Sequence, residues 1–390
     1  MCIVTHVPPE FRRARLTWVA YGMLAWFAYL QAAPGLVVVH LRDELGLSYA
    51  VGGLHVAAFA AGSMVAGGIS ATLERALGRR TLFWSAAVVM GAGAAGLTAG
   101  RVAAVTIGAV LVMGVGGGLL LATVQAALAD HHGERRAVAL AEANVAASVA
   151  YLALAGALSL TAALHAGWRV ALLVALVIPP LVWWSNRALA IDAPPPPPDV
   201  VRGRLPRVFW TAAAVLFCVT AAEWCVTAWG ATFVEDATRV SADVAVGLMA
   251  AYFGGVVVGR ALGSRLARRT DPARLLALAL AVTAVGFAVL WLATTSAEAV
   301  AGLSLLGLGL GNLFPMSVSV AVALAPGRAA LASSRAVGVT ASAVLLAPFT
   351  VGTLADATSL RAALGIVPVA LVLAAVGLAL VRRADVRAAG

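Results

Sequence analysis

The sequence contains no lysine, only three cysteines and few charged residues of any kind. Charged residues make up 11% of the 390 residues and apolar residues make up 62%. A soluble domain carries about 25% charged and about 45–50% apolar residues. A soluble fold of this length could not bury so much apolar side chain, so the chain is predicted to lie in a lipid bilayer.

The sequence contains no motif typical of disulfide frameworks, metal sites or ATP hydrolysis. Cys2, Cys218 and Cys225 form no CxxC pattern, which argues against a disulfide framework or a zinc site. There is no Walker loop and no HExxH motif, and the pair His131-His132 has no spaced partner. We therefore expect no enzyme activity, no cofactor, no metal site and no direct use of ATP.

The net charge of +10 comes from arginine alone. These arginines form short clusters between apolar runs, which indicates membrane topology rather than nucleic-acid binding. The apolar runs predict an all-α membrane protein of twelve transmembrane helices, because β-barrel strands would be shorter and alternating. The expected spans are 16–39, 49–71, 82–100, 102–128, 140–164, 169–189, 207–233, 244–264, 273–293, 297–324, 331–354 and 362–381.

The arginines also set the expected orientation. If the N terminus is cytoplasmic, 22 arginines fall in cytoplasmic segments and five fall outside. This split predicts a multi-pass protein of the plasma membrane with both termini in the cytoplasm. A signal peptide ending after Gln31 is a weaker alternative, because the first apolar run continues to Val39.

The chain divides into two similar halves. Five consecutive prolines lie within the polar segment 190–206, which predicts a stiff cytoplasmic linker. Arg15-Leu-Thr-Trp18 recurs as Arg207-Val-Phe-Trp210, and Gly78-Arg-Arg80 recurs as Ala267-Arg-Arg269. We expect six-helix bundles at 1–189 and 207–390, related by pseudo-twofold symmetry.

This pattern resembles the major facilitator superfamily over almost the whole chain. The segment Glu74-Arg75-Ala-Leu-Gly78-Arg79-Arg80 is a degenerate copy of that family's loop motif after the second span. The resemblance implies a cytoplasmic gate, to which we assign one set of residues. The set is Glu74, Arg75, Gly78, Arg79, Arg80, Arg268, Arg269 and Arg335.

The family resemblance implies a secondary transporter whose substrate binds near the membrane midplane and whose halves rock to give alternating access. The sequence departs from the family at two places. No arginine lies between Val102 and Leu128, and the fifth span lacks the Gly-Pro of the antiporter motif. Both departures count against drug–proton antiport.

One carboxylate interrupts the seventh apolar run. Glu223 is the only charged residue between Arg207 and Glu235. Its position along the expected helix lies past the membrane midplane. An ionisable group there is a candidate proton carrier, although a hydrogen bond between helices would also explain it. His55, near the outer end of the second span, is a weaker proton-coupling candidate.

Six further residues are candidate substrate contacts. Trp26 and Tyr29 are three residues apart and share a helix face, although core packing explains them equally well. Asn312 is the neutral hydrogen-bonding candidate nearest the midplane. The full set is Trp26, Tyr29, Gln31, Trp224, Tyr252 and Asn312.

These features predict a proton-coupled exporter of a small neutral, amphipathic or cationic molecule that works as a monomer. We expect the substrate not to be an anion, because the spans contain no basic residue at mid-depth that could bind one. A proton-coupled importer of a sugar or similar nutrient is the alternative. A membrane enzyme or a sensor would need a clustered catalytic set or a soluble domain, and the sequence shows neither.

Overall fold

The computed structural model describes residues 11–191, 204–266 and 269–389, and all regular elements in these ranges are helices. The expected linker lies largely at 192–203, outside the described residues, as does Arg268. The elements are α1 (Arg15–Leu45), α2 (Tyr49–Leu77), α3 (Arg79–Ala99), α4 (Ala103–His132), η1 (Gly133–Arg135), α5 (Arg136–Ala163), α6 (Trp168–Ala175), α7 (Ile178–Asn186), α8 (Arg207–Thr238), α9 (Ala242–Leu266), α10 (Pro272–Leu292), α11 (Ser296–Ala323), α12 (Ala329–Ala357), α13 (Leu360–Ala363) and α14 (Ile366–Ala389).

Within the described ranges, eleven helical stretches are long and apolar enough to cross a membrane. One of them, Ala103–Ala163, is 61 residues long and contains both α4 and α5. The chain is therefore an all-helical, multi-pass membrane protein, as the composition predicts.

The expected span 169–189 is divided into α6 and α7. Proline has no backbone N–H, so Pro179 cannot donate to the carbonyl of Ala175 four residues earlier. That carbonyl instead accepts a hydrogen bond of 2.8 Å from the indole nitrogen of Trp26 on α1. The break in this span thus has a local cause, and a side chain from another helix satisfies the freed carbonyl.

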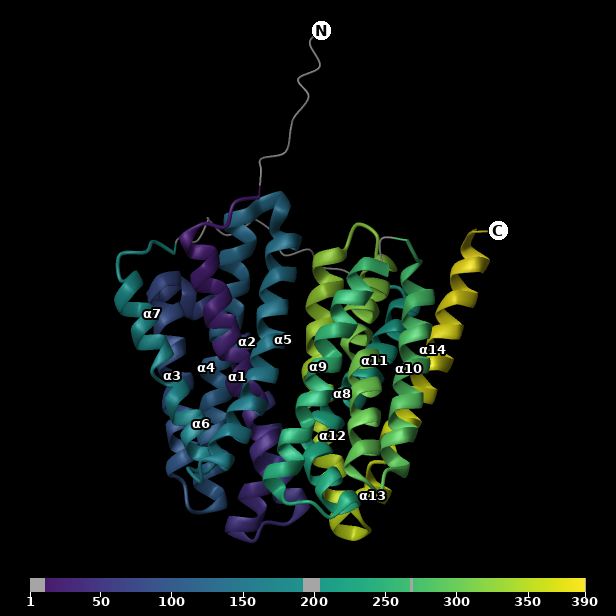
Figure 1. Cartoon of the computed structure of the whole chain (residues 1–390). Coiled ribbons are helices and arrows are strands. Elements are labelled where there is room, and N and C mark those ends of the chain that lie inside the picture. The colour runs from purple at the N-terminus through teal and green to yellow at the C-terminus, as the bar shows by residue number, and fades with distance from the viewer. Residues whose placement is uncertain (1–10, 192–203, 267–268, 390) are drawn as a thin grey trace.

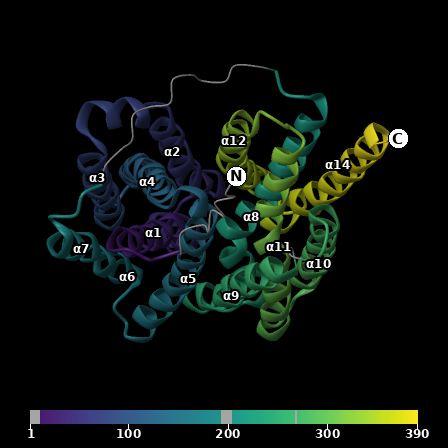
Figure 2. The same cartoon turned by 90° about the horizontal axis from the view of Figure 1, so that it is seen from above.

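The helices form two groups that follow chain order (Figure 1). Helices α1–α7 lie on one side and α8–α14 on the other. The start of α1 and the end of α14 lie at one end of the molecule, which we call the termini end; α13 lies at the opposite, far end. Seen from above, α2 lies beside α12 and α5 beside α9, and these two pairs, with α1 against α8, join the groups (Figure 2).

Glycines allow close helix contacts inside the second group. A Cβ atom on Gly307 would lie 2.0 Å from the carbonyl oxygen of Tyr252, and one on Gly311 would lie 2.7 Å from that of Val256. Both contacts join α11 to α9. Glycine at these two positions lets the backbones of α11 and α9 approach without a side chain between them.

The two groups touch closely at the far end. A Cβ atom on Gly53 of α2 would lie 2.9 Å from the carbonyl oxygen of Pro348 on α12, and one on Gly352 would lie 2.5 Å from that of Tyr49. The Trp229 ring of α8 lies 5.8 Å from the Tyr49 ring, and its indole nitrogen donates to the Pro348 carbonyl at 2.9 Å within the second group.

The same helix pair is open toward the termini end. Gly67 follows Gly53 by fourteen residues and Gly338 precedes Gly352 by fourteen, close to four helical turns, so each glycine pair shares a face. Among the described residues, no side chain or neighbouring helix lies within 4 Å of a Cβ built on Gly67 or Gly338. The pair α2 and α12 is therefore closed at the far end and separated at the termini end.

Candidate functional site

A small cavity lies at mid-depth between the two groups. Its volume is about 20 Å³, and a cavity of about 10–15 Å³ is the least that holds a water molecule. It thus has room for a water molecule but not for an organic substrate. Its walls come from α1, α5, α8 and α9, and consist of Ala32, Tyr151, Glu223, Trp224, Thr227, Tyr252, Phe253, Val256 and Arg260.

Glu223 is the one acidic residue in this wall. It lies near the centre of α8, which continues to Thr238, five residues beyond the expected span. In the described part of the chain, no arginine or histidine nitrogen lies within 4 Å of its carboxylate. The Thr227 hydroxyl, one turn later, donates to the Glu223 backbone carbonyl at 2.8 Å and lies 3.4 Å from the Tyr252 hydroxyl.

Arg260 of α9 lines the same cavity, which overturns the expectation of no basic group at mid-depth. Its Nη1 donates to the Ser148 hydroxyl on α5, and its Nε donates to the Gly311 carbonyl at 3.4 Å. The first bond links the two groups of helices. The sequence carried the signal for this residue: Arg260 falls inside the apolar run 244–264, on the same helix face as Tyr252 and Val256.

Polar and aromatic contacts extend the site across the interface between the groups. The Tyr151 hydroxyl of α5 donates to the Gln31 side-chain oxygen of α1 at 2.6 Å. The Tyr151 ring lies 5.7 Å from the Phe253 ring of α9, and the rings of Tyr252 and Phe253 lie 5.0 Å apart. The structure therefore brings Trp224 and Tyr252 into the cavity wall, with Gln31 directly behind it. Tyr151, Phe253 and Arg260 also line the cavity, and the sequence patterns did not single them out as site residues.

Two expected substrate contacts lie elsewhere. Trp26 is buried and bonded to the Ala175 carbonyl, and the Tyr29 hydroxyl donates to the Ala171 carbonyl at 2.9 Å. Both side chains fix α6 against α1 inside the first group. Their spacing correctly places them on one face, but that face packs on α6 and not on the cavity.

Asn312 and His55 also lie outside the cavity wall. The Asn312 side-chain amide donates to the Gly259 carbonyl at 2.7 Å and holds α11 to α9. His55 is buried between α2 and α4, with Nδ1 2.9 Å from the Val51 carbonyl and Nε2 2.9 Å from the Thr106 hydroxyl. Both polar side chains hydrogen-bond to a neighbouring helix. Such a structural role is the alternative to a functional role for a polar residue in a span.

The loop between α2 and α3 is held by charge pairs within the first group. Arg79 donates from Nε to Glu74 at 2.8 Å and from Nη1 to Asp130, at the end of α4, at 2.7 Å. Arg80 binds the Arg187 carbonyl, and Arg75 binds the Ala71 carbonyl at 3.2 Å.

Three residues complete the expected gate. Gly78 has φ +77°, a conformation that side chains disfavour. Arg335 is exposed near the start of α12, and the Arg269 backbone N–H donates to the Leu266 carbonyl at 2.9 Å. The role of these residues as a gate stays a prediction from the family resemblance.

A cross-group cap closes the far end. The Asp356 carboxylate, in the last turn of α12, accepts the backbone N–H groups of Tyr49 at 2.7 Å and of Ala50 at 2.9 Å. These belong to the first turn of α2, where N–H groups lack partners inside the helix and an acidic group is favoured. Sequence spacing could not reveal this contact, because 307 residues separate Asp356 from Tyr49.

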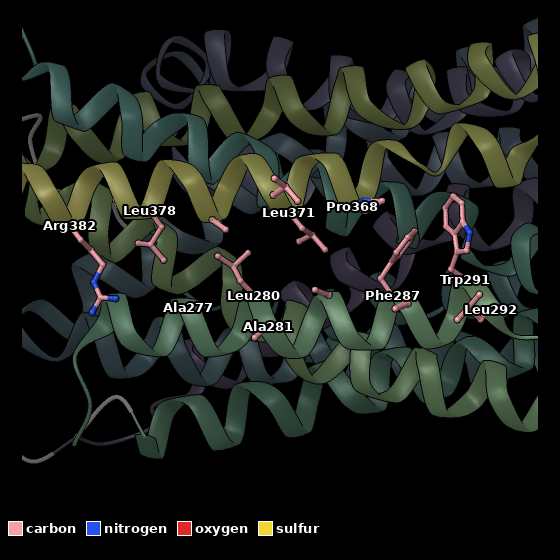
Figure 3. A pocket seen from close by; sticks show the side chains of 15 residues that line it. Ala277, Leu280, Ala281, Phe287, Trp291, Leu292, Pro368, Leu371, Leu378 and Arg382 are labelled. Atoms are coloured by element: carbon pink, nitrogen blue, oxygen red, sulfur yellow. The ribbon is translucent and has the colours of Figure 1, made fainter.

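Larger hollows lie on the outside of each group. One, of about 780 Å³, runs between α10 and α14, with Arg382 at one end and Trp291 at the other (Figure 3). Another, of about 800 Å³, lies between α3 and the α6–α7 segment. Their walls are mostly aliphatic or aromatic, which suits lipid chains better than a polar solute. Because neither lies between the groups, the small central cavity remains the candidate site.

Two comparisons with solved structures support this arrangement. A bacterial homolog of the human lysosomal transporter Spinster, in an inward-facing and occupied conformation, has a TM-score of 0.78 at 15% identity, covering 96% of this chain and 98% of that one. The POT family transporter PepTSo has a TM-score of 0.73 at 13% identity, covering 96% and 99%. At such identities the likeness shows the fold alone.

Sequence comparison identifies the family. No curated protein sequence matches the chain. The family model described as Major Facilitator Superfamily matches residues 17–297, which is more than half of the chain. The chain therefore belongs to the Major Facilitator Superfamily.

Proposed function

We propose that the protein is a proton-coupled secondary transporter, and not an enzyme, in which Glu223 carries the proton. Membership of the family and the fold of known transporters support a membrane transporter of small molecules. The observation that carries the rest of the proposal is the position of Glu223. It is the acidic residue in the wall of the cavity between the two groups, at mid-depth.

In this proposal the two groups are six-span bundles. Helices α4 and α5 have 30 and 28 residues, so each is long enough to cross the bilayer alone. Counting them separately turns eleven stretches into twelve spans, six before and six after the linker. One chain forms the whole cavity, so a monomer suffices.

The arginine distribution supports placing the termini end in the cytoplasm. With this orientation, the α2–α12 pair is closed outside and open inside. Rocking of the two groups would then open the far-end contacts of Gly53 and Gly352 and close the faces that carry Gly67 and Gly338.

A carboxylate in such a cavity can act as a proton carrier because its surroundings change with access. Taking up a proton removes a charge from a region of low dielectric, and contact with water on the other side allows its release. Export remains the proposed direction because the spans are so apolar. The sugar importer has less support, since Trp26 and Asn312, two of its expected contacts, are bound in helix packing.

The experiment uses the fluorescence of Trp224, the neighbour of Glu223, in the purified full-length protein. The fluorescence of Trp224 is the fluorescence of the wild type minus that of Trp224→Phe. Between pH 5 and pH 9 this fluorescence is expected to follow a titration curve. The titration is expected to vanish in Glu223→Gln and to persist in Glu134→Gln, which changes an exposed loop acid. Persistence in Glu223→Gln would reject Glu223 as the proton carrier.

A liposome assay then tests coupling. A pH-sensitive dye inside the vesicles reports proton flux evoked by benzoate, benzylamine, benzyl alcohol or glucose. Flux in wild type and in Glu134→Gln, but not in Glu223→Gln, is the expected result. Equal flux in all three proteins would contradict the proposal.

A further inference from the structure

The central cavity holds an arginine whose hydrogen-bond partners are all neutral. Arg260 bonds to a hydroxyl through Nη1 and to a carbonyl through Nε. In the described part of the chain, no carboxylate lies within 4 Å of its guanidinium, and Nη2 makes no hydrogen bond. A guanidinium has a planar fork of donors that fits the two oxygens of a carboxylate.

A charge at mid-depth in a membrane protein needs a compensating partner. Glu223 lines the same cavity and interacts electrostatically with Arg260, but no oxygen of its carboxylate lies within 4 Å of a guanidinium nitrogen. When Glu223 is protonated, Arg260 is the remaining charge in the cavity wall. An anionic group of the substrate can then supply the negative charge that the protonated Glu223 no longer provides.

Four of the other seven wall residues are aromatic. Tyr151 and Phe253 come from different groups, with ring centroids 5.7 Å apart, and Trp224 and Tyr252 complete the surface. Aromatic rings pack favourably against a flat apolar body at such separations. The cavity in this conformation is too small for a ring, so binding requires Tyr151 and Phe253 to separate as the groups move.

We infer that the substrate is a small monocarboxylate with an aromatic or similarly flat apolar body, and that Arg260 is its binding residue. This inference rests on the proposed function, which makes the central cavity the substrate site. It replaces the expectation of a neutral or cationic substrate, because that expectation depended on the absence of a basic group. The carboxylate binds Arg260 through two parallel hydrogen bonds while Glu223 holds a proton, so carboxylate and proton cross together without net charge. In the proposed direction of export, an outward gradient of the carboxylate drives this joint movement.

The test measures equilibrium binding of three probes to the full-length protein in nanodiscs. Benzoate, benzyl alcohol and benzylamine share a ring and differ in charge. Wild type is expected to bind benzoate at least about tenfold more tightly than either other probe, since a hydrogen bond to a charged group contributes about this factor. Benzoate affinity is also expected to fall as pH rises and Glu223 loses its proton.

Variants separate charge recognition from folding. Arg260→Gln is expected to reduce the benzoate preference to about twofold or less while leaving benzyl alcohol binding unchanged. Arg260→Lys keeps the charge without the planar fork and is expected to retain part of the preference. Because Arg260→Lys conserves the positive charge in the cavity, this variant tests the idea even if Arg260→Gln does not fold. Arg274→Gln, at an exposed arginine of α10, is the matched control.

Three outcomes would overturn the inference. Benzyl alcohol or benzylamine could bind wild type as tightly as benzoate, Arg260→Gln could keep the preference, or benzoate could fail to bind at all. The Trp224 titration needs no ligand and does not depend on Arg260. A protein that prefers benzoate but shows no Glu223 titration would therefore reject proton coupling and keep the carboxylate site.

Discussion

Two tryptophans show how the same residue type takes different roles at different positions. Trp26 is buried and bonded to the carbonyl that Pro179 leaves free, whereas Trp224 lines the central cavity. In sequence, each looks like a candidate substrate contact. The difference lies in the neighbouring helix: α6 covers Trp26, and α9 leaves space beside Trp224.

This contrast predicts opposite effects of two matched substitutions. Trp26→Phe removes the bond to Ala175 and is expected to lower the free energy of unfolding by about 1 kcal/mol, with a fall in melting temperature. Trp224→Phe is expected to leave the melting temperature nearly unchanged and to weaken benzoate binding. Thermal melts and binding isotherms of both variants check this. A loss of binding in Trp26→Phe without a change in melting temperature would place Trp26 in the site after all.

Gly78 is required by the backbone between α2 and α3. Its φ of +77° and ψ of 152° lie in a region used almost exclusively by glycine. Gly78→Ala is therefore expected to destabilise the protein by about 1–3 kcal/mol, although a Cβ atom would meet no neighbour there. Denaturant or thermal unfolding measures the effect. Gly68→Ala, inside α2 and equally open, is the control and is expected to cause no loss.

At the scale of elements, the important contact is between the end of α12 and the beginning of α2. Asp356 accepts from the first two N–H groups of α2, and Ser48 accepts from Val51 at 3.3 Å. The first turn of α2 is thus capped partly by its own group and partly by the other. A cap shared between groups can form only while the far end is closed.

Asp356→Ala is expected to weaken the closed far end by about 0.5–2 kcal/mol, the usual effect of losing a helix cap. Spin labels on the ends of α2 and α12 should report a larger population with the far end open. Asp271→Ala is the matched control, because Asp271 caps α10 within one group by accepting from Arg274 at 3.0 Å. An equal change in both variants would show that the cap stabilises a helix but not the closed state.

At the scale of the whole molecule, the closed far end and the open termini end are one of the two states of the proposed cycle. The glycine faces explain how the other state can form. Gly67 and Gly338 lie on the same faces that meet at Gly53 and Gly352, so the two helices can approach closely at either end.

This geometry predicts a conformation-dependent cross-link. In a background without native cysteines, the pair Gly67→Cys and Gly338→Cys is expected to form a disulfide only when the termini end closes. Benzoate with a proton gradient should increase the yield several-fold by driving the cycle. Gly67→Cys with Gly156→Cys is the control pair, since Gly156 is equally open but lies on α5. Rapid cross-linking without cycling would contradict an open termini end.

The sequence by itself determined that the chain lies in lipid, that it is all-α and which family it belongs to. The lipid environment and the helices follow from local composition and periodicity, since about twenty apolar residues must form a helix to cross a bilayer. The family is indicated by a resemblance, carried by the loop motif at residues 74–80 and the two similar halves. It also singled out Glu223, because a lone charge in an apolar run is visible without any knowledge of packing. The symmetry of the bundles and the orientation remain predictions from the same patterns.

Only the tertiary structure decided which polar side chains face one another. It assigned Trp26, Tyr29, His55 and Asn312 to helix packing, because each finds a backbone or hydroxyl partner on a neighbouring helix. It brought Arg260 to the cavity of Glu223, 37 positions away in the chain. The rotation of one helix against the next sets these contacts, and it depends on residues far apart in sequence.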